Sequence, residues 1–468
     1  MAVRIVFHYL TGYIADDAFI TFRYAENLAA GRGFVYNEGQ HVLGTTTPLF
    51  TLLLALLNFM GLSVIKSALT VSTAAAGLTA MVLYRFGQSL RFTRFAWFPA
   101  LAYIFWPRSL PADVSGMESA VFGLFVISAF YFQHKRLDVY AIGMATLASV
   151  TRPEGLGLVF VLVLYNWYRR PERAAYYLLI PLILLVPWLT FSYFYFGSII
   201  PNSVLAKLAL YSRFGQGTLW SRLVFVMAWH NPFGWVLFAA SIMGGYWLYR
   251  KQNFGGIEIA WMLLVIGFYT FARTVLFFWY ITPLYPLYLL FGTAAVPFVF
   301  ERWKWLTEHR RQAIIAAGTG MVVLSIAGAY KPAAYYHKLQ GIQMNCHRAI
   351  GTYLNTAAAP NDIVAAEDIG YMGYYSQRTI LDRDGLVSPE VIPYNKEGEY
   401  GMIIQDFRPE WVVAAKPGPF SNFVTDSVFL SQYAEQAAFP TGAHDYCIFK
   451  RKSGEAGTEE QSLDKSGF

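Results

Sequence analysis

The sequence predicts a mainly α-helical, polytopic membrane protein with a small C-terminal α/β domain. Of its 468 residues, 56% are hydrophobic and only 14% are charged, whereas soluble domains carry about 25% charged residues. The mean hydropathy is +0.38. The apolar runs are separated by short clusters of Arg and Lys, the pattern that orients helices in a membrane. These loops account for the net charge of +7, which is no sign of nucleic-acid binding.

About eleven apolar runs are candidate membrane crossings, because a spanning helix needs about 20 apolar residues. They lie at residues 3–14, 66–84, 95–107, 117–133, 138–150, 155–168, 174–196, 228–249, 257–276, 278–299 and 312–330. The first run reaches only about 20 Å as a helix, less than the roughly 30 Å of hydrocarbon. We therefore expect a thinned bilayer there or a start upstream of Met1.

Residues 47–61 form a further apolar run that does not fit this count. A full crossing there would invert the sidedness of every later loop. As a helix the run reaches about 22 Å. We therefore expect a re-entrant or surface-lying segment whose backbone is covered by protein.

The basic clusters set the orientation. They lie at residues 85–94, 135–136, 169–173, 250–251 and 302–311. Because loops rich in Lys and Arg stay in the cytoplasm, the loops at 15–46, 107–116, 151–154 and 197–222 are expected on the opposite side. The chain is then a multi-pass protein of the inner (cytoplasmic) membrane, and everything after Tyr330 is extracytoplasmic.

Three parts follow along the chain. Residues 1–335 form the transmembrane module, 336–452 a soluble extracytoplasmic α/β domain, and 453–468 a polar tail expected to be disordered. Within the domain, the patterns at 361–367, 410–416 and 446–451 are typical of strands, and the pattern at 346–358 is typical of a helix.

Cys346 and Cys447 are the only cysteines and form no CxxC motif, so no zinc or iron–sulfur site is indicated. Both fall in the domain expected outside the cytoplasm, where a disulfide between them would persist. The sequence leaves open whether they are bonded.

Asp16 and Asp17 are adjacent acids directly after the first apolar run. Like charges at close range repel, so a cation, a hydrogen-bond donor or a substrate is expected to hold them. The alternative is an N-cap on the amphipathic helix that follows. A cap uses one Asp and leaves the second unexplained.

Three more candidate sites lie in loops expected on the same side. Glu118 stands at a helix start, where a helix cap is an equal alternative. Arg152 is suited to bidentate phosphate binding, or to pairing with Glu154. Lys207, five residues after Asn202 in a neutral stretch, either meets an anion or extends its amine to the membrane surface.

Arg273 lies near a helix end, before Trp279 and Tyr280, and a charge there needs a partner. Asp382 and Asp384 belong to the sequence Asp-Arg-Asp-Gly-Leu, for which a turn is the alternative. The chain has no GxSxG, HExxH, Walker or GxGxxG pattern, so hydrolase and nucleotide-binding functions gain no support.

The run DDAFITFRYAENLAAGRGFVYNEGQHVLGTTTPLFTLLLA, which begins at Asp16, resembles the first extracytoplasmic loop of the GT-C superfamily of membrane glycosyltransferases. The strings SGMES, TRPEG, FGSIIPNSVLAK and ILDRDGL follow in the order expected for that group. The resemblance therefore covers the chain from about Asp16 to Leu386. It is greatest to the AftB-type arabinofuranosyltransferases and their bacterial relatives.

This resemblance implies a GT-C fold and a donor sugar, arabinofuranose or a hexose, carried on polyprenyl phosphate. The acceptor is expected to be a hydroxyl of a glycan, lipid or protein in the cell envelope. The acid pair would supply the catalytic base, with Asp16 preferred and Asp17 orienting it, in one inverting displacement. Lys207 would face the donor phosphate, with Arg152 and Arg273 as further candidates.

Two alternatives stay open. A divalent cation (Mg²⁺, Mn²⁺ or Ca²⁺) held by Asp16 and Asp17 is compatible with oxygen ligands, although two carboxylates do not establish a metal site. A transporter or flippase of lipid-linked sugars is the alternative function, and such proteins often show repeated halves and intramembrane acids.

Overall fold

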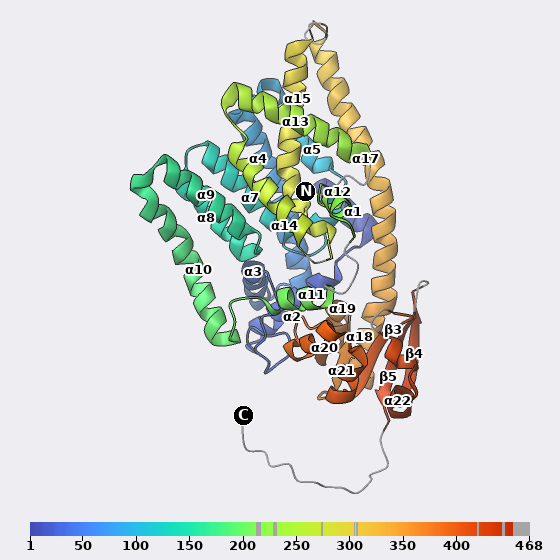
Figure 1. The fold of residues 1–468 in the computed structure, drawn as a ribbon. Helices are drawn as coiled ribbons and strands as arrows, with labels where there is room; N and C mark the ends of the chain where they lie inside the picture. Colours follow the sequence, from blue (N-terminus) through green and yellow to red (C-terminus); the bar gives the residue numbers. More distant parts are fainter. Residues whose placement is uncertain are drawn as a thin grey trace.

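Two architectures follow one another along the chain: a bundle of helices and, after it, a sheet flanked by helices (Figure 1). The computed structural model describes residues 1–211, 217–227, 232–272, 275–303, 305, 308–418, 421–441 and 445–452. The predicted tail at 453–468, Arg273 and the start of the expected crossing at 228–249 lie outside the described residues. A mostly helical chain with a small sheet is confirmed.

Helices lie at the positions of the expected crossings. The bundle contains α1 (Ala2–Thr11), α2 (Asp16–Ala29), α3 (Pro48–Phe59), α4 (Val64–Ser89), α5 (Phe98–Phe105), α6 (Leu110–Asp113), α7 (Ser119–His134), α8 (Asp138–Thr151), α9 (Gly155–Arg169), α10 (Ala174–Phe196), α11 (Asn202–Tyr211), α12 (Leu219–Val226), α13 (Pro232–Gln252), α14 (Gly256–Phe271), α15 (Tyr285–Arg302) and α17 (Arg310–Ile342). Pro48 begins α3 at a position that needs no N–H. Gly197 ends α10 with a left-handed φ of 73°, the conformation that favours glycine.

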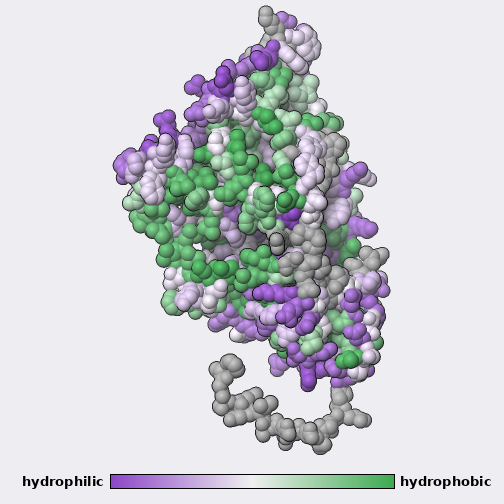
Figure 2. Space-filling model, viewed as in Figure 1, coloured by the Kyte–Doolittle hydropathy of each residue, from purple (hydrophilic) through white to green (hydrophobic). Residues whose placement is uncertain are grey.

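Four described helical segments are long and apolar enough to cross a membrane: Val64–Ser89, Pro171–Phe196, Phe278–Arg302 and Arg311–Ala357. Shorter apolar helices lie at Pro48–Phe59, Ser119–His134, Gly155–Arg169 and Gly256–Phe271. Hydrophobic residues cover the middle of the face shown in Figure 2, and hydrophilic residues gather at its upper edge and lower end. The count of about eleven crossings stays a prediction.

The short apolar segment near residue 50 is the helix α3, with 12 residues. Its length of roughly 18 Å is too short to span the hydrocarbon. Phe50 and Leu54 on one face are buried, whereas Leu56 and Phe59 on the other are exposed. The segment therefore lies against the bundle on one side only.

The long helix α17 continues through a π-helical turn, Gln343–Arg348, into α18 (Ala349–Ala357). The continuous helical segment Arg311–Ala357 has 47 residues, or roughly 70 Å, more than twice the hydrocarbon thickness. Figure 1 shows it running from the far end of the bundle to the sheet. The expected boundary at 335/336 falls inside this helix, so a rigid rod, and not a loop, carries the α/β part.

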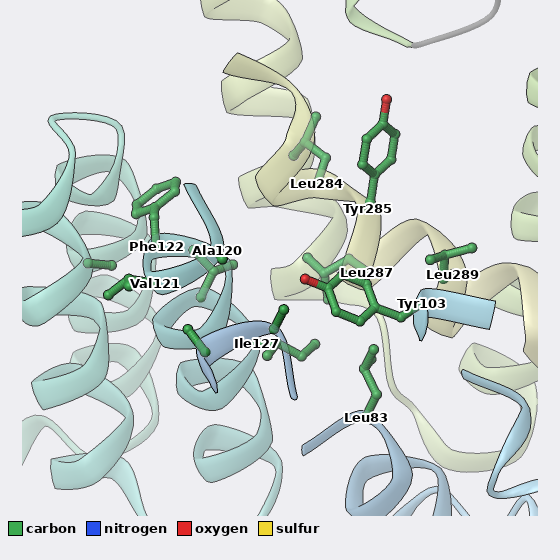
Figure 3. Close-up of a cluster of buried hydrophobic side chains, with 14 of the residues drawn as sticks. Leu83, Tyr103, Ala120, Val121, Phe122, Ile127, Leu284, Tyr285, Leu287 and Leu289 are labelled. Atoms are coloured by element: carbon green, nitrogen blue, oxygen red, sulfur yellow. The ribbon is translucent and has the colours of Figure 1, made fainter. Parts of the chain in front are cut away.

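The core of the bundle lies where α4, α5, α7 and α15 meet (Figure 3). Phe122 and Ile127 from α7 and Leu83 from α4 are at most 1% exposed. Leu287 of α15 and Tyr103 of α5 belong to the same buried cluster. This core fixes the helices whose ends form the candidate site.

The sheet has five strands: β1 (Ile363–Ala366), β2 (Thr379–Asp382), β3 (Trp411–Lys416), β4 (Tyr433–Pro440) and β5 (Asp445–Arg451). Their order is β2-β1-β3-β5-β4; β2, β1 and β3 are parallel, and β5 is antiparallel to β3 and to β4. Helices α18 and α19 (Ile369–Ser376) cover one face, and α21 (Tyr400–Phe407) and α22 (Ser427–Gln432) cover the other. A short helix, α20 (Ile392–Glu397), contacts α11.

Cys346 and Cys447 are both buried and free, so the expected option of a disulfide is not realised. Cys346 packs with Val364 and Ile448 on one face of the sheet. Cys447 packs with Val412 on the other face, because neighbouring residues of a strand point to opposite sides.

A buried ion pair fixes α1 to the bundle. Arg4, 1% exposed, donates from Nε and Nη2 to Asp113 Oδ2 at 3.1 and 2.9 Å, and from Nη2 to the carbonyl of Tyr103 at 3.0 Å and to Ser109 Oγ at 3.1 Å. Asp113 is fully buried. Both charges are therefore compensated inside the protein.

We expect Arg4→Met to leave Asp113 buried without its cation and to destabilise the fold by about 3–5 kcal/mol. The double variant Arg4→Met/Asp113→Leu removes both charges and should recover most of that loss. Apparent melting temperatures in detergent measure both. Equal losses in the single and double variants would show that the ion pair is not what stabilises this contact.

Candidate active site

A cavity of about 650 Å³ lies between the bundle and the sheet domain. Its walls come from α2, the loop at 44–47, the ends of α7, α8 and α9, the helices α11 and α14, the segment before α15, and Leu386 of the domain. Five residues predicted from the sequence line it together: Asp17, Glu118, Arg152, Glu154 and Lys207.

Asp17 and Lys207 lie next to each other in the cavity wall. Asp17 is the second residue of α2 and Lys207 lies in α11, and Lys207 Nζ is 3.9 Å from Asp17 Oδ2. The side chain of Asp17 is 36% exposed and that of Lys207 22%. Because the chain places them in the cavity wall, both atoms can reach a ligand there.

The surroundings shift the pKa values of both Asp17 and Lys207. Burial raises the pKa of Asp17, as do the carboxylates of Asp16 and Asp368, and the ammonium of Lys207 opposes them without reversing the rise. Burial lowers the pKa of Lys207, but Tyr280 and Asp17 raise it by more. The lysine therefore stays charged, and the aspartate takes up a proton more readily than usual.

Arg152 is enclosed by two carboxylates. Its Nη1 donates to Glu118 Oε1 at 2.8 Å, and its Nη2 donates to Glu154 Oε1, also at 2.8 Å. Tyr269 donates its hydroxyl to the same Glu154 oxygen. The guanidinium is thus paired inside the protein, the pairing that the sequence offered as the alternative to phosphate binding.

Asp16 points away from the cavity, toward the sheet domain. Its two carboxylate oxygens accept the backbone N–H groups of Gly370 and Tyr371 at 3.0 Å, at the start of α19. His347 Nδ1 lies 3.6 Å from Asp16 Oδ1. Burial lowers the pKa of His347, but the carboxylates of Asp16 and Asp368 outweigh it and the net shift is upward. Asp16 therefore fastens the domain to α2.

Asp382 and Asn202 hold the turn that brings Leu386 to the cavity. Asp382 accepts from the backbone N–H groups of Asp384 and Val387 at 3.0 Å. Asn202 donates its amide to the carbonyls of Gly385 and Leu386 at 2.6 and 3.0 Å. Burial raises the pKa of Asp382 to about 7, and burial together with the Asp382 carboxylate raises the pKa of Asp384 well above its usual range. The turn predicted as the alternative for this motif is present.

The donor set does not fit a metal ion. Both oxygens of Asp16 are taken by backbone N–H groups, and Asp17 faces a lysine. Among the described residues, no group of three or more His, Cys, Asp or Glu side chains is arranged to hold a metal. Arg273, the third phosphate candidate, lies outside the described residues.

One side of the cavity is apolar and open. Leu208 of α11 and Leu264 and Phe268 of α14 line it and are 46%, 40% and 60% exposed. Exposed apolar side chains on helices of a membrane protein face lipid at no cost. The cavity therefore joins a charged end to a wall suited to hydrocarbon.

Several residues of the site carried no signal in the sequence. Tyr269 and Tyr280 approach Glu154 and Lys207, but tyrosines in membrane helices are common for other reasons. Ser203 lines the cavity and His347 meets Asp16. Ser203 lies within the string FGSIIPNSVLAK and His347 within the helical pattern at 346–358, but only their positions in space single them out.

The arrangement of helices, sheet domain and cavity defines a GT-C type of membrane protein fold. ArnT from Cupriavidus metallidurans, solved bound to undecaprenyl phosphate, superposes with a TM-score of 0.62 at 13% identity over 98% of this chain and 97% of its own. The Archaeoglobus fulgidus oligosaccharyltransferase, solved with Zn and sulfate, superposes with a TM-score of 0.57 at 10% identity over 95% of this chain and 72% of its own. At these identities the likeness shows the fold.

Two comparisons of the sequence with known proteins add to the structural similarity. A terminal β-(1→2)-arabinofuranosyltransferase of Mycobacterium tuberculosis is 27% identical over 257 residues, which is 49% of this chain and 40% of the relative. A family model described as a domain of unknown function (DUF8728) matches residues 333–453. The resemblance to GT-C glycosyltransferases expected from the sequence is confirmed.

The contact between Asp16 and α19 can be tested by a substitution at a residue that does not itself line the cavity. A Cβ at Gly370 would collide with the backbone carbonyl of Asp16, whereas a Cβ at Gly341 meets nothing within 4 Å. We expect Gly370→Ala to destabilise the docked domain by about 1–3 kcal/mol, and Gly341→Ala, the matched helical control, to be neutral or stabilising.

Limited proteolysis and melting temperature report the docking. Faster cleavage around α19 in Gly370→Ala alone is the expected result. Equal protection of both variants would mean that this contact does not hold the domain.

Proposed function

We propose that this protein transfers a glycosyl residue from a polyprenyl-phosphate donor to a hydroxyl of a cell-envelope acceptor. One observation carries the proposal: the cavity sets a carboxylate and an ammonium 3.9 Å apart next to an apolar wall. A base, a cation for a phosphate and a surface for a lipid chain are what this reaction needs. The relatives support it, since one is an arabinofuranosyltransferase and another was solved with undecaprenyl phosphate.

The step is a single displacement. The acceptor oxygen forms a bond to the anomeric carbon while the bond from that carbon to the phosphate oxygen breaks. The electron pair of the broken bond leaves with polyprenyl phosphate, and the proton of the acceptor hydroxyl passes to a carboxylate. Attack opposite the leaving group inverts the anomeric centre. The leaving group needs no proton, because a phosphate already carries charge well when a cation lies beside it.

We assign the base to Asp17, and Asp16 becomes a positioning residue. Only Asp17 of the pair lines the cavity, and its pKa is raised above the usual aspartate value by burial, which favours proton uptake. Both oxygens of Asp16 are occupied by α19. The sequence favoured Asp16 because adjacent acids cannot be told apart without the helix direction.

The identity of the sugar and the orientation in the membrane complete the proposal. The arabinofuranosyltransferase relative supports an arabinofuranosyl donor. The hydroxyl-bearing residues Thr21, Thr45 and Thr46 line the cavity and supply hydrogen bonds suited to a sugar. The basic loops favour an extracytoplasmic site in the inner membrane, with Lys207 and the sheet domain on that side.

Asp17→Asn should lower the turnover number by about 10²–10⁴-fold, because the base is lost while the shape is kept. Asp16→Asn should lower it far less and should instead lower the melting temperature, because one of two bonds to α19 is lost. Release of free polyprenyl phosphate from a synthetic polyprenyl-phosphate sugar measures transfer. If Asp16→Asn loses more turnover than Asp17→Asn, the base belongs to Asp16.

Lys207→Gln should lower kcat by about 10²–10³-fold, since one charge-stabilising donor is removed. It should also move the acid limb of the pH–rate profile upward. The ammonium lowers the pKa of Asp17; without it, the base is protonated up to a higher pH. Lys207→Arg keeps the charge and should keep the limb in place. If the acid limb of the pH–rate profile does not move in Lys207→Gln, the charge of Lys207 does not affect the pKa of the base.

A further inference from the structure

One buried hydroxyl in the cavity wall has no partner. Ser203 of α11 is 5% exposed, and its Oγ makes no hydrogen bond with any described residue. A buried hydroxyl without a partner is unfavourable, so a ligand that supplies an acceptor would remove the penalty. Ser203 belongs to the lining of the cavity that also holds Lys207.

The spacing of α11 places Ser203 with Lys207. Four of its residues line the cavity: Ser203, Val204, Lys207 and Leu208. Residues four apart lie on the same side of a helix, so Ser203 and Lys207 form a polar strip and Val204 and Leu208 an apolar strip beside it. The opposite side of the helix is buried against the domain through Ala206.

The polar strip has the chemistry of an anion site. A hydroxyl and an ammonium supply several N–H and O–H donors, and Ser203 lies in the first turn of α11, where the helix dipole favours negative charge. This turn is held in place, because the backbone N–H of Asn202 donates to the carbonyl of Leu43 at 2.7 Å and its side chain binds the turn at Gly385.

The apolar strip points to a lipid. Val204 and Leu208 are 36% and 46% exposed, and Leu264 and Phe268 of α14 line the same cavity. A free phosphate gains nothing from contact with these apolar side chains, whereas an allylic or saturated prenyl chain on a phosphate would cover them and exclude water. The two strips together match an amphiphile with an anionic head.

We propose that Ser203 is a donor-binding residue whose hydroxyl donates to a non-bridging phosphate oxygen beside Lys207, while Val204 and Leu208 contact the first isoprene units. This rests on the proposed function and names the side of the cavity that holds the lipid phosphate. The same hydrogen bond strengthens as the phosphate gains charge during transfer. Asp17 then lies on the other side of Lys207, where the acceptor enters.

Binding of farnesyl phosphate to the full-length protein in detergent, measured by calorimetry, tests this. Farnesol and inorganic phosphate are the probes that separate chain from head. The wild-type protein should bind farnesyl phosphate at least tenfold more tightly than either. Inorganic phosphate that binds as tightly as farnesyl phosphate would overturn the lipid assignment.

Ser203→Ala should weaken the binding of farnesyl phosphate by about tenfold or more, because a hydrogen bond to a charged acceptor is lost. Ser192→Ala is the matched control, because Ser192 is also buried, its hydroxyl also has no partner among the described residues, and it is outside the cavity lining. If Ser203→Ala does not fold, Ser203→Cys replaces a strong donor by a weak one and should weaken binding in the same direction.

The outcomes separate this inference from the proposed function. Unchanged affinity in folded Ser203 variants, with transfer intact, overturns the role of Ser203 and leaves glycosyl transfer standing. Weakened affinity in these variants, with no transfer from any polyprenyl-phosphate sugar, supports the lipid-phosphate site and overturns the proposed activity. A wild-type protein that does not bind farnesyl phosphate overturns the inference.

Discussion

The docking of α19 onto Asp16 is the constraint on which the candidate site depends. One carboxylate receives two backbone N–H groups from the first turn of a helix 354 and 355 residues away in sequence, where the dipole favours an anion. Consecutive residues of an α-helix lie about 100° apart around its axis. When Asp16 is turned toward the domain, Asp17 is turned to another side, and that side is the cavity. The repulsion between adjacent acids is thus resolved by geometry: each meets a different donor.

A continuous helix joins the two parts of the chain. The segment Arg311–Ala357 runs without a break from the bundle to the sheet, so the domain cannot rotate freely on a linker. It rests on α2 through α19 and on α11 through α20. Both α2 and α11 contribute a charged group to the cavity. The domain therefore contacts both helices that carry Asp17 and Lys207, although it supplies neither residue; among its described residues, Leu386 alone lines the cavity.

The sequence predicted the class of fold and most charged residues of the site, for physical reasons that also mark its limits. Composition and basic loops predict insertion in a membrane. The lone Lys207 and the adjacent pair of Asp residues are conspicuous because charges near lipid are costly. The direction in which each acid side chain points cannot be predicted, because nothing in the sequence around Asp16 indicates which acid faces a helix that begins at residue 369. Pairings across long separations are equally hidden. The pairs Arg4–Asp113 and Arg152–Glu118 form only in the folded bundle. Within the string FGSIIPNSVLAK, Ser203 is singled out only by a buried hydroxyl that has no partner among the described residues.

The charges of the cavity suit a reaction that moves negative charge without creating it. Arg152 with Glu118 and Glu154 sums to −1 and is internally paired, whereas Asp17 and Lys207 sum to zero. In the proposed step, Asp17 takes a proton and becomes neutral as the phosphate gains one negative charge. The total is constant, and the negative charge passes from one side of Lys207 to the other. In a low-dielectric cavity a change in net charge would have a high free-energy cost. The transfer of one negative charge from one side of a fixed cation to the other does not have that cost. The nearness of Lys207 to both partners is therefore a requirement of the proposed chemistry, and it places the acceptor on the side of Asp17 and the lipid phosphate on the side of Ser203.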